Sequence, residues 1–328
     1  MAELDLTMPR ARLVDVRQGA TVVNTQPAVF RIAGVGALAC LQGLLTNDVV
    51  QPGDGSVVYG ALLTPKGMIV VDAWVLRRGE AMTLIVPRGG REAAAELLRR
   101  SIPPRLARVT DLSDETRVAW LLGEHGFHTL AKSGIDAPDA AGRVAEPSDV
   151  AAEALVALAP ETAPFVALFA GPAAAVDALA DRLVAAGSRA GEECDLHALR
   201  ILAGWPALGA EIDERTLPQE VRYDEIGGVS YTKGCYTGQE TVARLHFRGH
   251  TNRELRGVRW DEAGVPEARS VVAGGREVGT VRSTLTLEDL TLGLAVMRRE
   301  VPLGGDVVAG GRPAVVVSLP FGADALEA

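Results

Sequence analysis

The run Tyr231-Thr-Lys-Gly-Cys-Tyr-Thr-Gly-Gln-Glu-Thr-Val-Ala-Arg244 carries the most information in this 328-residue sequence. Within it, Thr237-Gly-Gln-Glu240 has the T-x-x-E form of a capping box, in which the threonine hydroxyl and the glutamate satisfy first-turn N–H groups. The pattern predicts a helix that starts at Gly238, with Cys235 just before its positive end and near Lys233. A helix N-terminus and a lysine both favour a thiolate. The run therefore predicts either a reactive thiol or a small side chain that fills a gap in a tight loop.

Arginines and histidines gather directly downstream, with Glu254 as the only acid before Asp261. Guanidinium groups match phosphate and carboxylate oxygens, so the cluster predicts either a contact to an RNA backbone or a solvated strand edge that its charge protects from aggregation. His246 and His250 with Cys235 would supply three zinc ligands, but no fourth is evident and no bound metal is expected. The arginines are Arg244, Arg248, Arg253, Arg256 and Arg259.

Residues 204–220 form a second candidate binding segment. It is a loop rich in proline and glycine that carries Trp205 and several acids, Glu220 among them. Trp205, Tyr223 and Tyr236 would form stacking walls for a flat heterocycle whose ring N–H groups bond to a carboxylate. The alternative is that Trp205 belongs to the core.

Asp72 interrupts the apolar run Met68–Val75. An unpaired carboxylate is costly to bury, so Asp72 either faces solvent or serves a site.

The pattern of strands and helices indicates an α+β fold, because the two types are mixed without a regular βαβ period. From about Glu254 onward, short strands separated by Gly-Gly turns predict a small all-β domain of barrel or sandwich type. Strands are predicted at 21–24, 28–32 and 68–75, and helices at 36–45, 91–100 and 173–186.

Composition excludes several classes of protein. The 33 Lys+Arg against 42 Asp+Glu give a net charge of −9, which argues against coating nucleic acid through bulk charge. Cys40, Cys194 and Cys235 form no C-x-x-C pair, so neither a disulfide framework nor a thiolate metal site is expected. With an acidic N-terminus and no apolar stretch long enough to span a bilayer, a cytoplasmic protein without membrane contact is expected.

The segment Lys233-Gly-Cys-Tyr-Thr-Gly-Gln-Glu240 resembles the K-G-C-Y-x-G-Q-E signature of the YgfZ family, folate-binding proteins related to the glycine-cleavage T-protein, an aminomethyltransferase. The similarity extends over nearly the whole chain, through residues 41–48, 59–67, 200–220, 279–283 and 320–321. It implies a three-lobed, cloverleaf α+β arrangement around a central tetrahydrofolate cavity, with a C-terminal β-barrel. The expected domains are residues 1–50 with 190–253, residues 51–189, and the barrel 254–328.

The resemblance also implies roles for individual residues. Cys235 matches the cysteine regarded as functionally central, expected on the rim of the folate cavity. Asp72 corresponds to the aspartate that assists catalysis near the folate N5 in T-protein relatives. The T-protein has two adjacent aspartates where this chain has Val71-Asp72, and no cysteine in the signature, which argues against aminomethyl transfer. Folate contacts are expected from Trp205, Arg200, Glu220, Tyr236, Lys233, Gln239 and Glu240.

The function implied is binding of tetrahydrofolate in support of iron–sulfur protein assembly or repair, and thereby of tRNA modification. A single cysteine cannot hold a cluster, so contact with the iron–sulfur proteins or their assembly machinery would be transient. One alternative is a folate-dependent aminomethyltransferase or methyltransferase with Asp72 as base or orienting carboxylate. Another is a tRNA-binding module that uses the arginine cluster. The sequence leaves open whether any reaction is catalysed.

Overall fold

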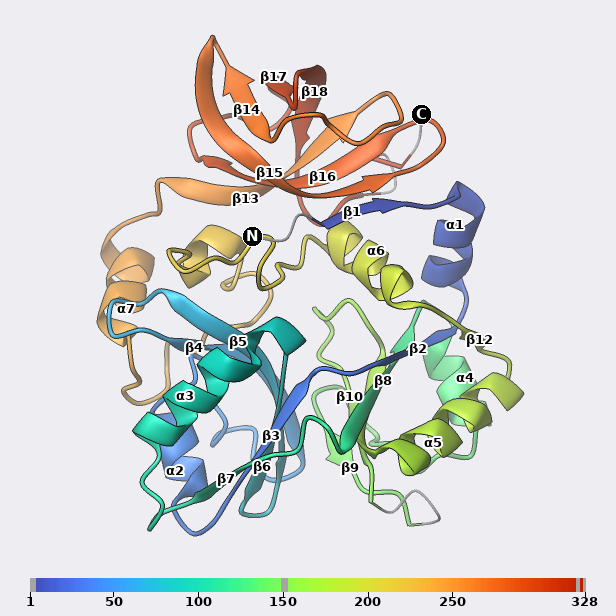
Figure 1. Ribbon diagram of the computed structural model, residues 1–328, viewed down its shortest axis with the longest axis vertical. Coiled ribbons are helices and arrows are strands. Elements are labelled where there is room, and N and C mark those ends of the chain that lie inside the picture. The colour runs from blue at the N-terminus through green and yellow to red at the C-terminus, as the bar shows by residue number, and fades with distance from the viewer. Residues whose placement is uncertain (1–3, 149–152, 323–324, 327–328) are drawn as a thin grey trace.

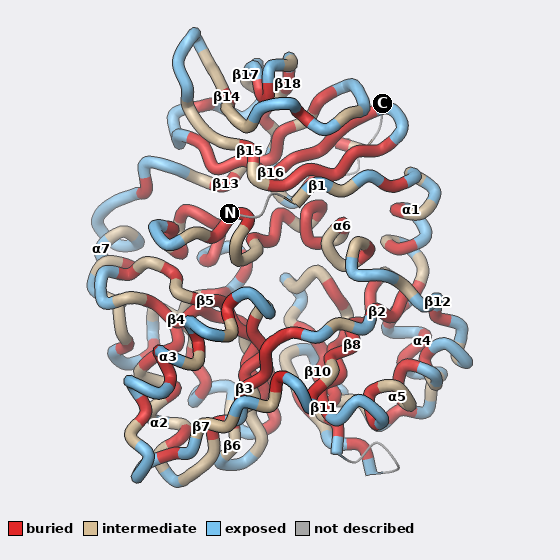
Figure 2. The backbone as a smooth tube through the Cα atoms, in the orientation of Figure 1, coloured by how far each residue is buried: buried red, intermediate tan, exposed pale blue. Residues whose placement is uncertain are grey.

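Three β-sheets organise this computed structural model, which describes residues 4–148, 153–322 and 325–326. Two α+β lobes lie side by side and an all-β lobe lies across them (Figure 1). The strands of all three lobes are largely buried, whereas most connecting loops are exposed (Figure 2). In the part of the chain described, no helix is long and apolar enough to cross a membrane.

The first lobe is built on a five-stranded antiparallel sheet. The helices α2 (Ala37–Gln42) and α3 (Arg91–Ser101) contribute Leu41, Leu97 and Leu98 to its core. The strands, in sheet order, are β4 (Ser56–Leu63), β5 (Ile69–Arg78), β6 (Ala81–Val86), β3 (Ala28–Ala33) and β7 (Arg108–Asp111).

The second lobe has a six-stranded sheet whose core takes Leu130 from α4 (Gly126–Lys132) and Leu179 from α5 (Ala173–Ala185). Its strands, in sheet order, are β12 (Arg189–Ala190), β2 (Thr21–Thr25), β8 (Thr116–Leu122), β11 (Ala167–Pro172), β10 (Leu155–Leu158) and β9 (Val144–Ala145).

The third lobe is a closed β-barrel, which confirms the predicted C-terminal barrel. Pairing of β15 with β16 closes a ring of six strands, and β1 (Leu4–Thr7) adds to β15 from outside. At Gly274-Gly275 and Gly310-Gly311 both glycines have positive φ, as tight two-residue hairpins require. The ring runs β15 (Arg276–Thr286), β14 (Ser270–Ala273), β17 (Asp306–Ala309), β18 (Arg312–Val317), β13 (Arg253–Trp260) and β16 (Thr291–Arg298).

Helix α6 (Glu193–Ala203) lies where the three lobes meet (Figure 1). It starts at a capping box between Glu192 and Asp195 and ends at Gly204, whose φ is 62°. The remaining elements are α1 (Arg10–Gln18), the 3₁₀ turns η1 (Arg88–Gly90) and η2 (Pro218–Val221), and α7 (Gln239–Arg248).

The structure contains the helices and strands that the sequence predicted individually, including the helix expected at 36–45, which is the shorter α2. The helices expected at 91–100 and 173–186 are α3 and α5, and the strands expected at 21–24, 28–32 and 68–75 are β2, β3 and β5. The predicted domain bounds stay a prediction. The first sheet takes β3 from segment 1–50 and its other strands from segment 51–189.

The predicted capping box at Thr237 is wrong. Helix α7 starts at Gln239, its N-cap is Gly238 with a φ of 83°, and no side chain caps it. A Cβ atom on Gly238 would lie 2.6 Å from the Thr64 carbonyl oxygen and 3.0 Å from Gly67 Cα. The close approach of the β4–β5 turn requires glycine at the cap, and Thr237 instead donates its N–H to the Gly43 carbonyl at 3.0 Å.

Gly238→Ala should lower the free energy of unfolding by at least about 2 kcal/mol, because a left-handed alanine costs roughly 1–2 kcal/mol and the new methyl group clashes with the β4–β5 turn. Urea denaturation measures the change. Gly234→Ala is the matched control, since it lies in the same loop with nothing within 4 Å of its Cβ position. Equal stability of the two variants would contradict this account of the cap.

Candidate functional site

A cavity of about 570 Å³ lies between the first two lobes and helix α6. Its walls come from β5 and β6 of the first lobe, the β2–β3 turn and Trp120 of the second, helix α6, and residues 205–208. The volume is in the range of sites for small organic ligands. The predicted residues Asp72, Arg200 and Trp205 all line it.

Aromatic rings form much of the cavity wall. Trp74 and Trp205 are stacked with centroids 5.7 Å apart and an interplanar angle of 14°. Phe165 meets Trp74 and Trp120 edge-on, at 4.9 Å and 4.7 Å. Flat, fixed rings of this kind suit a planar heterocycle.

Asp72 reaches the cavity because of the two-residue period of β5. Val71, Ala73 and Val75 pack into the core of the first lobe, so Asp72 and Trp74 point to the opposite face. The strand is therefore apolar on one side and presents a carboxylate on the other.

Two buried tyrosines hold the Asp72 carboxylate. Tyr59 donates its hydroxyl to Asp72 Oδ2 at 3.0 Å, and the Tyr223 hydroxyl lies 3.1 Å from that of Tyr59. Because the Tyr59 proton is committed to Asp72, Tyr223 is the donor to Tyr59. Asp72 Oδ1 accepts no hydrogen bond from any other described residue.

Burial raises the pKa of Asp72 to about 6, and the Tyr59 hydrogen bond and the charge of Arg200 offset only part of this effect. A carboxyl group with this pKa exchanges a proton near neutral pH, as a general acid or base must.

Arg200 and His197, one helical turn apart on α6, line the same cavity. Arg200 donates from Nη1 to the Trp205 carbonyl at 2.7 Å and to Glu211 Oε2 at 2.9 Å, and from Nη2 to Ser283 Oγ at 2.9 Å. Burial and the charge of Arg200 lower the pKa of His197 to about 4, so its ring is neutral at pH 7. Arg200 Nε and His197 Nδ1 are buried without a partner among the described residues.

The signature residues lie elsewhere. Lys233 Nζ donates to the carbonyls of Gln42, Leu45 and Asn47 at 2.7–2.8 Å, and burial lowers its pKa to about 8. It fastens residues 231–238 to the loop after α2. Cys235 is exposed and is not among the residues that line this cavity, so its expected place on the rim of a folate cavity stays a prediction.

Four other expected folate-binding residues do not line this cavity either. Glu220 accepts from Arg253 Nε at 3.0 Å, which joins η2 to the barrel. Tyr236 is buried below Lys233, whose Nζ lies 5.0 Å from the ring centroid. Gln239 and Glu240 occupy the first turn of α7.

The arginine cluster divides in two. Arg244 and Arg248 are exposed on α7 and contact no acid in the described residues. Arg253, Arg256 and Arg259 lie on β13 and contact Glu220, Glu254 and Asp261.

Sequence reasoning missed His197 and Arg88, which line the cavity, and Tyr59, which donates to Asp72. Only Tyr59 carried a signal, since it lies in the family-like segment 59–67. No group of three or more His, Cys, Asp or Glu in the described ranges could hold a metal ion.

Comparison with known proteins matches residues 10–143 to the family model for the GCVT N-terminal domain. The chain is 30% identical over 288 residues to the tRNA-modifying protein YgfZ of Escherichia coli O157:H7 (strain EC4115 / EHEC), covering 86% of each chain. It is 29% identical over 290 residues to that of Enterobacter sp. (strain 638), again over 86% of each. The glycine cleavage system aminomethyltransferase T from Bartonella henselae shares the fold, with a TM-score of 0.77 and 19% identity over 95% of this chain and 89% of that one.

Asp72→Asn should stabilise the protein more at pH 7 than at pH 4. Between the unfolded pKa of about 3.9 and the folded value of about 6, the folded wild type binds a proton that the unfolded chain lacks, so wild-type stability falls as pH rises. Asparagine does not titrate, so the variant keeps this stability. In the wild type the lost free energy of unfolding amounts to about 2–3 kcal/mol above pH 6. Urea unfolding across this range measures it, with exposed Asp181→Asn as control. If the difference in free energy of unfolding between Asp72→Asn and the wild type does not change with pH, this would contradict burial of the Asp72 charge.

Proposed function

This chain belongs to the YgfZ family, and from that premise we propose that it binds a reduced folate, tetrahydrofolate, in the central cavity and uses the binding to support iron–sulfur proteins. One observation carries the folate proposal: three buried polar atoms without partners in the described chain, Asp72 Oδ1, His197 Nδ1 and Arg200 Nε, belong to residues around one aromatic cavity.

These residues fit a pterin. Its pyrimidine half is flat and presents N–H donors beside a carbonyl acceptor. The Asp72 carboxyl accepts from such N–H groups, Arg200 Nε donates to a carbonyl, and neutral His197 does either according to its tautomer. Trp74 and Trp205 supply the ring contacts. Unpaired buried groups are costly, so a ligand that pairs them gains affinity and is distinguished from analogues that do not.

Asp72 gives the site one titratable carboxyl group. Folate, when bound, supplies the one-carbon chemistry of the T-protein fold, and Asp72 would hold or release a proton beside it. Val71, which stands where T-protein relatives have a second aspartate, points into the first-lobe core. A single carboxylate favours binding over aminomethyl transfer, which remains the alternative function.

Cys235 would act separately, toward protein clients. It is exposed, and Lys233 holds its loop against the loop after α2 through three carbonyl contacts. One thiolate cannot hold a cluster, so the proposed contact is a transient one with an iron–sulfur protein. All three cysteines are free thiols, which agrees with the cytoplasmic location that we also propose.

Anaerobic calorimetric titration with tetrahydrofolate should give micromolar affinity. Asp72→Asn should weaken binding about tenfold, because a charge-assisted hydrogen bond contributes about 1.5–3 kcal/mol. Absence of binding by the wild type would overturn the folate proposal. Turnover of an aminomethyl donor, abolished in Asp72→Asn, would favour the transferase alternative.

The control for this titration is Cys235→Ser, which should fold and bind folate as the wild type does because Cys235 is outside the cavity. In cells that depend on this protein, it should nevertheless reduce the activity of an iron–sulfur enzyme, whereas Cys40→Ser should not. Equal activity of the two variants would remove Cys235 from the proposal.

A second candidate function, contact with tRNA, is favoured by the exposed face of α7. Arg244 and Arg248 are one turn apart without acidic partners in the described chain, and Phe247 between them is 66% exposed. His246 stacks on Tyr231 with centroids 3.6 Å apart. Cations interleaved with exposed aromatic rings suit single-stranded nucleic acid. The curated relatives are named tRNA-modifying proteins.

Arg244→Ala with Arg248→Ala should weaken tRNA binding in a filter assay and lower the slope of log K against log salt concentration by about 2, because two phosphate contacts are lost. The double variant Arg99→Ala with Arg105→Ala removes the same charge from exposed positions near the first lobe and controls for net charge. Equal salt-dependence slopes for both double variants would exclude the α7 face as a tRNA contact.

A further inference from the structure

We propose that Arg88, at the mouth of the cavity, binds the carboxylates of a folate's glutamate tail. The inference deepens the proposed function and rests on it. It narrows the ligand from any pterin to a folate that carries one or more glutamates.

The first ground is position. Arg88 lines the same cavity as Asp72, yet its side chain is 50% exposed whereas Asp72 is 7% exposed. A ligand whose heterocycle meets Asp72 inside can therefore extend outward past Arg88. In a folate, the group farthest from the heterocycle is the glutamate.

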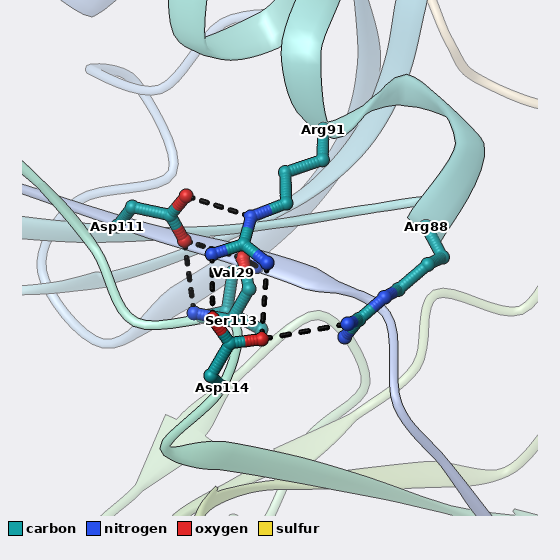
Figure 3. Close-up of polar contacts among 6 residues, drawn as sticks. All are labelled: Val29, Arg88, Arg91, Asp111, Ser113 and Asp114. Atoms are coloured by element: carbon teal, nitrogen blue, oxygen red, sulfur yellow. Dashed lines mark hydrogen bonds and ion pairs between the residues drawn. The ribbon is translucent and has the colours of Figure 1, made fainter.

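The second ground is the set of contacts around Arg88 (Figure 3). Arg91 donates to both oxygens of Asp114, at 3.0 Å and 2.9 Å, and to Asp111 at 2.8 Å. Ser113 ties the same turn to β3 by accepting from the Val29 N–H at 3.0 Å. Arg91 therefore satisfies the acids of this turn without Arg88.

The Arg88 side chain makes one hydrogen bond in the described residues, from Nη2 to Asp114 Oδ1 at 3.4 Å. Arg91 already engages that carboxylate, and Asp114 is 67% exposed, so the attraction between Arg88 and Asp114 is weak. A ligand carboxylate that accepts two parallel N–H bonds from the guanidinium would form the stronger pair.

The third ground is the rest of the mouth. Gln26, in the β2–β3 turn, is exposed beside the cavity, and its amide has no hydrogen bond within the described chain. It offers two further N–H donors. Glu193 of α6 also borders the cavity, and its charge would direct an anionic tail away from α6 and toward Arg88.

The test compares tetrahydrofolate, its triglutamate form and 6-methyltetrahydropterin, which has no carboxylate, by anaerobic calorimetry. Arg88→Ala should weaken tetrahydrofolate binding about tenfold and the triglutamate at least as much, but leave the pterin unchanged. Arg105→Ala, outside the cavity, should change none of the three.

Asp114→Asn separates a binding role from a structural one. If Arg88 binds the glutamate carboxylates, removing the competing Asp114 carboxylate should raise the affinity for tetrahydrofolate, even though it also weakens the contact between Arg91 and residue 114. Lower affinity for all three ligands in both Arg88→Ala and Asp114→Asn would show that Arg88 only holds the turn and would overturn the inference. If the wild type binds none of the ligands, the folate proposal itself fails. If it binds all three and Arg88→Ala changes none, only the tail site fails.

Discussion

The buried ion pair between Arg200 and Glu211 is the contact on which the central cavity depends. The two side chains are 6% and 0% exposed. Through Arg200 the pair fixes the Trp205 carbonyl, and through Ser283 it reaches β15 of the barrel. A buried pair adds little stability over an apolar substitute, but removal of one partner typically costs 3–5 kcal/mol because the other charge is left unpaired. Its main effect here is specificity: it fixes how α6, the Trp205 loop and the barrel meet.

The same junction explains why the cavity contains polar groups that the fold does not satisfy. Arg200 uses both terminal nitrogens on structural partners, which leaves Nε without a partner in the described chain. Asp72 uses Oδ2 on Tyr59 and keeps Oδ1 without a partner among the described residues. Each side chain is thus oriented by one set of contacts and keeps one polar atom without a partner in the described chain. Such atoms cost stability in the ligand-free protein, and preorganised sites commonly carry this cost.

Much of this arrangement could be predicted from local sequence. Periodicity predicts α3, α5 and β5, and paired glycines predict the barrel hairpins, because these features depend on neighbouring residues. Asp72 was identifiable as a polar residue in an apolar strand. His197 was not, since a histidine in an amphipathic helix gives no signal until the cavity beside it is known.

The error at the signature has a physical cause. A T-x-x-E pattern predicts a capping box from four residues, but the approach of Thr64 and Gly67, distant in sequence, requires glycine at the cap. The error arises because a tertiary contact overrides a local pattern. The sequence also could not show that Lys233 is engaged by carbonyls of the loop after α2, since these residues are far away along the chain.

The cavity and the exposed thiol are separate in space but joined by a continuous set of contacts. Tyr59 binds Asp72 with its hydroxyl, and its backbone carbonyl accepts from Asn47 Nδ2 at 2.7 Å. The Asn47 carbonyl in turn accepts from Lys233 Nζ at 2.8 Å, two residues from Cys235. Contacts alone do not make two sites communicate, because coupling needs an element with two arrangements that both sites bias. Asn47 is where these contacts meet: it also donates to the Gly227 carbonyl at 2.7 Å, so this one residue contacts the segment that carries Cys235 at two points.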